Sequence, residues 1–185
     1  MPRSALLVMD VQNVIVDRYA DESCLSRLRE AIEAARAAGL PVIHVTVGFR
    51  PGRAEISPRN RMFGPLADRA PSPQEEWANA IHSEAAPLAS EPVVVKRRVS
   101  GFAGSDLDVI LRSQGVEHLV LAGIATSGVV LSTLRQAADL DFGLTVLSDA
   151  CADADPEVHW VLMEKVFPQQ AQVLTVRDWR SAPLS

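Results

Sequence analysis

Three places in the sequence carry groups that could do chemistry, and each follows an apolar run. Asp10 comes after residues 5–9, and Lys96 comes after residues 93–95. The third place is the glycine-bearing turn at 123–130, which opens a segment with helical spacing. A nearby ammonium group holds a carboxylate ionised, and backbone N–H groups at a helix start can stabilise developing negative charge. Brought together, the three features would suit hydrolysis.

Apolar runs that alternate with helical patterns predict how these features are positioned. We expect strands at residues 5–9, 42–47, 93–95, 117–122, 144–147 and 171–176. Such alternation is typical of parallel strands joined by crossover helices. The predicted fold is therefore α/β: a three-layer, doubly wound sheet of about six mainly parallel strands with helices on both faces. Ligands bind such sheets beyond the carboxyl ends of the strands, where all three features fall.

Two helix starts are marked by residues that favour capping. Ser105 is predicted to cap one helix, with Asp108 three residues later as the acid of a capping box. Asp155 is predicted to cap another, since Pro156 at the first helical position suits the fixed φ of proline.

Residues 48–92 are the longest stretch without clear periodicity, and they hold seven of the twelve prolines. Long irregular segments in compact domains are usually lids or binding loops. This one also carries five arginines, Arg50, Arg53, Arg59, Arg61 and Arg69. Two interpretations stay open: a solvated surface loop or subunit contact, and a pocket cover that offers cations to an anionic group.

Composition excludes several classes of protein. The length of 185 residues fits one domain over 1–185, and the net charge of -5 argues against nucleic acid as a partner. No apolar run approaches a membrane span, and the first ten residues do not read as a signal peptide, so we expect a cytoplasmic protein. Two cysteines give no disulfide framework, and four unpaired histidines give no metal-ligand spacing. We expect no metal and no cofactor, and a small molecule as the partner.

With these residues the chain resembles the isochorismatase-like family of cysteine hydrolases, which includes nicotinamidases, N-carbamoyl amidohydrolases and isochorismatases. Three ordered motifs carry the resemblance over nearly the whole chain. They are LLVMDVQN at 6–13, KRRVSGFAGSDL at 96–107 and LVLAGIATSGVV at 119–130.

The resemblance implies roles for particular residues. Asp10 matches the family's base and Lys96 its cation. Ala125 and Thr126 match the turn that binds the oxyanion, with a cis peptide bond expected at about 125–126. It also suggests a homodimer or homotetramer, and three candidates for substrate contact, Gln12, Phe102 and Arg59.

The family's nucleophilic cysteine is missing, because its position is Val129. Valine cannot form a thioester, so three outcomes stay open. Asp10 and Lys96 could hydrolyse a small anionic, amide or vinyl-ether substrate without a thiol, as true isochorismatases do with Asp as general acid. The chain could be a catalytically silent member that binds a small molecule or pairs with another subunit. It could also be an amidase with a displaced nucleophile, Cys151 or Ser127.

Overall fold

Six parallel strands form one sheet in a computed structural model that describes residues 3–70 and 72–182. The strand order is β3-β2-β1-β4-β5-β6, and every neighbouring pair is parallel. The strands are β1 (Arg3–Met9), β2 (Val42–Val47), β3 (Val93–Lys96), β4 (Val116–Ile124), β5 (Gly143–Ala152) and β6 (Gln172–Leu174). The order reverses between β1 and β4, which is where doubly wound sheets bind ligands. The predicted fold is confirmed.

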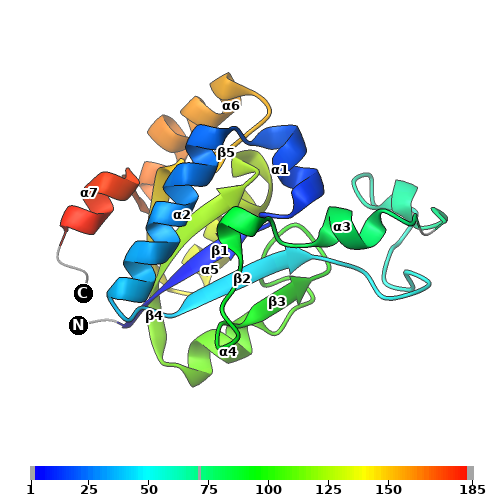
Figure 1. Cartoon of the computed structure of the whole chain (residues 1–185), viewed down its shortest axis with the longest axis horizontal. Helices are drawn as coiled ribbons and strands as arrows, with labels where there is room; N and C mark the ends of the chain where they lie inside the picture. Colours follow the sequence, from blue (N-terminus) through cyan, green and yellow to red (C-terminus); the bar gives the residue numbers. More distant parts are fainter. Residues whose placement is uncertain (1–2, 71, 183–185) are drawn as a thin grey trace.

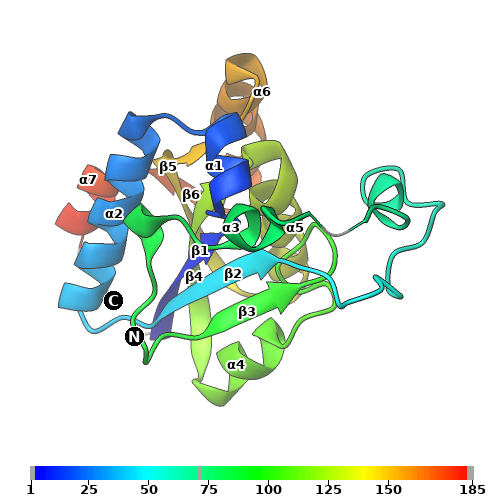
Figure 2. The ribbon, with the colours of Figure 1, turned by 45° about the vertical axis from the view of Figure 1, so that its right-hand side comes forward.

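Helices cover both faces of the sheet, as Figures 1 and 2 show. One apolar cluster joins the sheet to α1 (Asn13–Tyr19), α2 (Glu22–Ala37) and α7 (Val176–Ser181). The opposite cluster joins it to α4 (Leu107–Ser113), α5 (Leu131–Asp139) and the helical stretch that follows α6 (Pro156–Val161). Strand β1 serves both clusters, because Leu6 and Leu7 point to opposite faces.

The main difference from the predicted strands lies in β5, which continues past Leu147 to Ala152. Between the pairs Leu121↔Val146 and Gly123↔Cys151, four residues of β5 stand against one residue of β4. This bulge includes polar side chains, so no continuous apolar run marks it in the sequence.

The predicted last strand is also too long, because β6 ends at Leu174 and α7 begins at Val176. The cap at Asp155 is confirmed, since its carboxylate accepts from the N–H groups of Glu157 and Val158. The predicted cap at Ser105 is wrong by one residue. Asp106 is the capping residue, although Ser105 Oγ still accepts from the Leu107 N–H group at 3.3 Å.

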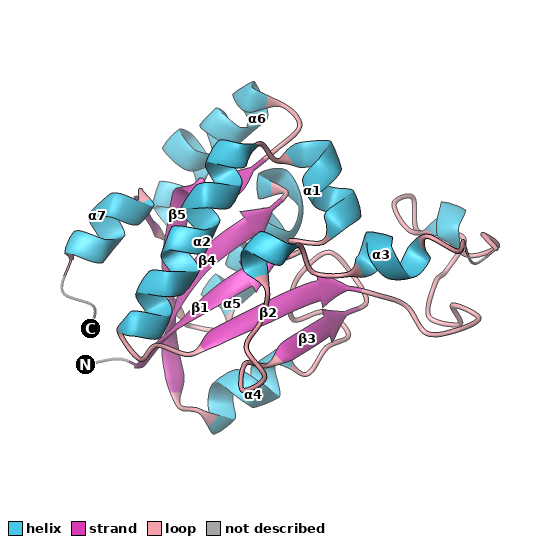
Figure 3. Ribbon diagram, viewed as in Figure 1, coloured by secondary structure: helices cyan, strands magenta, loops and turns pink. Residues whose placement is uncertain are grey.

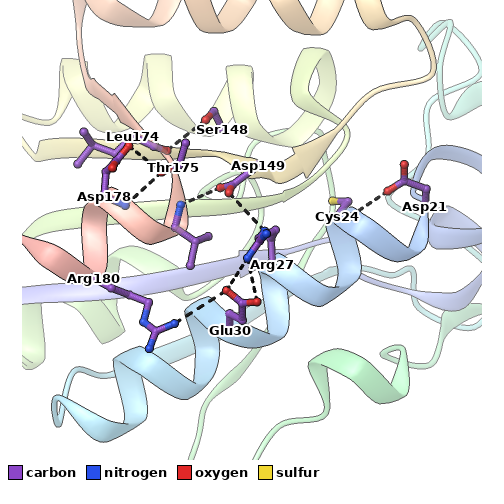
Figure 4. Close-up of polar contacts among 11 residues, drawn as sticks. Asp21, Cys24, Arg27, Glu30, Ser148, Asp149, Leu174, Thr175, Asp178 and Arg180 are labelled. Carbon is purple, nitrogen blue, oxygen red and sulfur yellow. Dashed lines mark hydrogen bonds and ion pairs between the residues drawn. The ribbon is translucent and has the colours of Figure 1, made fainter.

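Charged side chains fasten the C-terminal helix α7 to α2 and β5 (Figure 4). Arg27 of α2 pairs with Glu30 at 2.9 Å and with Asp149 of β5 at 3.8 Å. Asp149 in turn accepts from the backbone N–H of Val176 at 2.8 Å, and Arg180 lies 3.9 Å from Glu30. Helix α7 is therefore held against the same face of the sheet as α2.

The segment between β2 and β3 extends away from the sheet before it returns, and most of it is loop (Figure 3). Its short helical pieces are η1 (Gly64–Leu66), α3 (Glu75–Asn79) and η2 (Ser83–Ala85). Within the described residues, no helix has both the length and the apolar character needed to cross a membrane.

Candidate active site

Strands β1 and β4 approach closely at the point where the strand order reverses. Met9 pairs with Gly123, and a Cβ atom on Gly123 would clash with the Met9 backbone. Gly123 has a φ of 140°, which also favours glycine. The residue that follows β1, Asp10, has a φ of 54°, a region that few residues other than glycine, Asn and Asp enter. The tight junction therefore sets the position of the Asp10 side chain.

Asp10 and Lys96 form a buried ion pair at the carboxyl edge of the sheet. Lys96 Nζ lies 2.8 Å from Asp10 Oδ2, and the Lys96 and Asp10 side chains are 2% and 9% exposed, respectively. Lys96 Nζ also donates to the backbone carbonyl of Arg98 at 3.0 Å. The second oxygen, Asp10 Oδ1, is buried and has no hydrogen-bond partner among the residues that the structure describes. One oxygen is thus held by the cation and the other is left to accept.

Burial raises the pKa of Asp10 from 3.8 to about 6, although Lys96 and, to a smaller extent, the backbone N–H of Val47 oppose the shift. A carboxyl group with a pKa near neutrality can both take and give a proton at working pH. The geometry therefore provides an acid–base group fixed by one cation.

The loop that follows Lys96 is tied to the long segment after β2. Arg98 donates to the carbonyl of Arg97 at 2.6 Å and to that of Glu55 at 2.7 Å. Arg97 donates to the carbonyl of Gly48 at 2.6 Å. These contacts fix the residue whose carbonyl orients Lys96. The motif from Lys96 to Arg98 was visible in the sequence, but no sequence signal marked Glu55 as its partner.

The turn after β4 contains a cis peptide bond between Ile124 and Ala125, one residue before the predicted place. The Ala125 carbonyl accepts from the N–H groups of Gly128 at 3.0 Å and Val130 at 3.3 Å. In the described part of the chain, the N–H groups of Ala125 and Val129 donate to no residue outside the turn. Two backbone donors therefore lie at this turn without a partner from another element.

Contacts with β5, with the residue that follows it and with α6 anchor the same turn. Thr126 is fully buried, and its hydroxyl donates to the Ala152 carbonyl at 3.1 Å and lies 2.8 Å from His159 Nδ1. Ser127 is exposed, and its backbone N–H donates to Asp153 at 2.7 Å. Thr126 thus positions the turn through its side chain, and His159 and Asp153 are neighbours of the site that the sequence did not indicate.

No thiol occupies the nucleophile position. Val129 is 2% exposed and belongs to the apolar cluster that packs against α5. Cys151 is buried in β5 opposite Gly123, and burial raises the pKa of its thiol above the usual range. Burial likewise raises the pKa of Cys24 to about 12. Because the thiolate is the reactive form, neither cysteine is suited to attack a substrate.

The three candidates for substrate contact are placed differently. Gln12 is buried, and its amide accepts from the Val47 N–H at 2.9 Å and donates to the carbonyls of Val47 at 3.1 Å and Asn79 at 2.8 Å. The Phe102 ring is buried with its centroid 6.1 Å from that of Phe142.

Arg59 lies exposed on the extended segment. Contact of Gln12, Phe102 and Arg59 with substrate stays a prediction. Nor does a cluster of three or more His, Cys, Asp or Glu side chains suited to a metal occur within residues 3–70 and 72–182.

Comparisons with known proteins match this architecture. The family model for the isochorismatase domain matches residues 4–178. The ureidoacrylate amidohydrolase RutB of Stutzerimonas stutzeri is 34% identical over 95% of this chain and 77% of its own length. The isochorismatase family protein YecD of Escherichia coli O157:H7 is 32% identical over 95% and 93%, respectively.

Solved structures agree. An isochorismatase family protein from Burkholderia thailandensis superimposes with a TM-score of 0.85 at 30% identity, covering 98% of this chain and 95% of that one. The N-carbamoylsarcosine amidase of Thermoplasma acidophilum gives a TM-score of 0.75 at 26% identity, covering 95% and 97%. The chain therefore belongs to the isochorismatase-like hydrolase family.

Proposed function

We propose that this hydrolase cleaves a small amide or ureido substrate with water as the nucleophile, Asp10 as the proton-transferring group and Lys96 as its fixed counter-ion. The observation that carries the proposal is the ion pair of 2.8 Å in which Asp10 Oδ1 is left without a partner among the described residues. The relatives named for ureidoacrylate and N-carbamoylsarcosine support this class of substrate.

In the proposed reaction, Asp10 accepts a proton from water as the water oxygen forms a bond to the substrate carbonyl carbon. The carbonyl oxygen gains negative charge, and the N–H groups of Ala125 and Val129 are the donors that would stabilise it. The tetrahedral intermediate then expels its nitrogen, which takes the proton from Asp10. The products are a carboxylic or carbamic acid and an amine or ammonia, and no covalent enzyme intermediate forms.

A vinyl ether is the second candidate substrate, and the raised pKa of Asp10 favours it. A carboxyl group with a pKa of about 6 is partly protonated near neutrality and can protonate the alkene carbon. Water then adds to the resulting oxocarbenium carbon, and the hemiketal collapses to a carbonyl compound and an alcohol. This route also needs no group at Val129.

Turnover of a panel of N-carbamoyl amino acids, primary amides and vinyl ethers tests the proposal. Asp10→Asn should lower kcat/KM for any substrate found by about 10²–10⁴-fold, because general acid–base catalysis is lost. Asp17→Asn is the matched control, since Asp17 is exposed on α1. Equal activity of Asp10→Asn and wild type would overturn the role of Asp10.

The absence of thiol catalysis needs its own variants. Cys24→Ala and Cys151→Ala should each retain turnover, and the intact mass of the protein should stay unchanged during the reaction. A substrate-derived adduct on Cys151 or Ser127 would show that the reaction is covalent after all.

A further inference from the structure

The end of β5 and the segment that leads from it into α6 hold the turn after β4 at two neighbouring residues. The Thr126 hydroxyl donates to the Ala152 carbonyl at 3.1 Å, and His159 Nδ1 lies 2.8 Å from the same hydroxyl oxygen. One residue further along the turn, the Ser127 N–H donates to the Asp153 carboxylate at 2.7 Å. A side chain and a backbone group of the turn are therefore both attached to this one segment.

The place of His159 is set by the capped start of α6. The Asp155 carboxylate accepts from the N–H groups of Glu157 and Val158, and the Asp155 carbonyl accepts from the His159 N–H at 3.0 Å. Helix α6 packs beside the turn, and His159 is only partly exposed there. The imidazole ring therefore reaches Thr126 from a helix that begins at a defined residue.

The hydrogen bonds of Thr126 decide which nitrogen of His159 carries the proton. A hydroxyl group has one proton to donate, and a carbonyl oxygen can only accept. Because Thr126 gives its proton to the Ala152 carbonyl, His159 Nδ1 must donate to the hydroxyl oxygen. Burial lowers the pKa of His159, although Asp153 opposes the shift, so the ring is largely neutral near pH 7. The arrangement therefore requires the neutral tautomer with its proton on Nδ1.

The Thr126 hydroxyl lies where a change of direction would be costly. Thr126 is fully buried, and a buried hydroxyl that loses a partner destabilises the fold. Thr126 directly follows Ala125 and precedes Val129 by three residues. Donors at a site of this kind act only when they point at the place where negative charge develops. The direction of one buried hydroxyl is therefore linked to the direction of the two free N–H groups of the turn.

We propose that His159 is a positioning residue for this turn. Its Nδ1–H group directs the Thr126 hydroxyl to the Ala152 carbonyl, and this attachment holds the N–H groups of Ala125 and Val129 in place for an oxyanion. The inference rests on the proposed function for the role of those two N–H groups. The proton on Nδ1 and the attachment of the turn need no substrate, so they are tested separately.

The tautomer of His159 is the first test. ¹⁵N NMR of the wild-type chain at pH 8, where the ring is neutral, should show His159 protonated on Nδ1 and not on Nε2. A neutral ring protonated on Nε2 would overturn the inference, because the ring would then have no proton to give to Thr126.

His159→Asn and His159→Leu form a matched pair, because the two new side chains are similar in size and only the Asn amide can donate from about the position of Nδ1. His159→Leu should shift the amide signals of Ala125 and Val129, and His159→Asn should leave them near their wild-type positions. His118→Leu is the control, since His118 Nε2 lies 2.9 Å from the Thr145 hydroxyl, away from the turn. Equal shifts in the Asn and Leu variants, or shifts as large in His118→Leu, would overturn the inference.

Turnover of any substrate found in the panel is the last test. His159→Leu should lower kcat by about 10–10²-fold with little change in KM, because misplaced donors weaken binding of the transition state and not of the substrate. His159→Asn should restore most of the loss, and His118→Leu should leave kcat unchanged. Wild-type kcat in His159→Leu would overturn the inference and leave the role of Asp10 standing. No turnover of any compound, with the expected tautomer and amide signals, would count against the proposed function alone.

Discussion

Two regions of one sheet edge differ in what they bury. The ends of β1 and β3 bury a carboxylate and an ammonium group, Asp10 and Lys96. The turn after β4 buries an aliphatic side chain, Val129. Burying an ion pair costs desolvation energy that its attraction often fails to recover, whereas a buried valine contributes to the core. The charged region therefore needs a reason other than stability, and the proposed catalysis supplies one.

At the turn after β4, the side chain at position 129 and the backbone N–H groups differ in what they can contribute to catalysis. The Ala125 and Val129 N–H groups have no partner outside the turn in the described part of the chain, and backbone groups do not depend on the side chain at position 129. Thr126 anchors the turn through β5 and α6. A frame for binding an oxyanion is thus compatible with the loss of the nucleophile.

Among the variants considered, Lys96→Met should lower the stability of the chain the most. Removing one partner of a buried pair typically lowers the free energy of unfolding by about 3–5 kcal/mol. Lys96 lowers the pKa of Asp10, so the variant should raise that pKa above 6. Below the new pKa the carboxyl group is neutral, and the destabilisation should be smaller at pH 5 than at pH 8. Chemical denaturation at the two pH values measures the difference.

The double variant Asp10→Asn/Lys96→Met is the control for this effect. With both charges removed, no isolated ion remains buried, so its stability should exceed that of Lys96→Met at pH 8 and should vary less with pH. An equal loss of stability for Lys96→Met at both pH values would show that Asp10 does not carry the buried charge.

The free energy of unfolding of the wild-type chain should depend on pH because of the same Asp10 carboxyl group. The pKa of Asp10 is about 6 in the folded state against an ordinary value of 3.8, so the folded state binds this proton more tightly than the unfolded state does. The contribution of Asp10 to stability is therefore fully present below about pH 4 and is lost as the pH rises to about 6. Denaturation of wild type and Asp10→Asn across this range measures it, and parallel curves would contradict the raised pKa.

Thr126→Val should have a smaller effect, on the turn. The variant removes the hydroxyl that bonds the Ala152 carbonyl and His159, which should lower the free energy of unfolding by about 1–3 kcal/mol. It should also lower activity, because the turn loses its attachment to β5 and α6. Thermal denaturation and turnover measure the two effects.

Thr145→Val is the matched control away from the turn. Thr145 is also buried and its hydroxyl lies 2.9 Å from His118 Nε2. Its loss should cost comparable stability and leave activity unchanged. If both variants reduce activity equally, the turn is not specifically positioned by Thr126.

Buried strands have a clear apolar signature, and the sheet was therefore well predicted. The run at 42–47 coincides with β2, and Asp155 with Pro156 marks α6. The placement of Asp10 and Lys96 at one edge followed from the rule for parallel sheets. The fold and the candidate ion pair could therefore be inferred without coordinates.

Contacts between distant residues could not be predicted. The hydrogen bond from Arg98 to Glu55 joins residues 43 positions apart in the sequence, and the one from Gln12 to Asn79 joins residues 67 positions apart. Neither residue type signals its partner, because both bonds end on backbone carbonyls. The shape of the long segment between β2 and β3 could not be predicted for the same reason, because it depends on such bonds.

Val129→Cys should change stability least, by about 1 kcal/mol, because the two side chains are similar in size and both suit a buried site. The new thiol would lie at the start of a helix, on the sheet edge that carries Lys96, and both features lower the pKa of a thiol. Cys24 and Cys151 provide an internal control, since burial raises the pKa of each. Alkylation by iodoacetamide at pH 7, followed by peptide mass spectrometry, should therefore modify position 129 faster than either native cysteine. If position 129 reacts no faster than Cys151, burial outweighs the two electrostatic effects. Restoring the sulfur atom would then not restore a reactive thiol, because the surroundings of position 129 no longer lower its pKa.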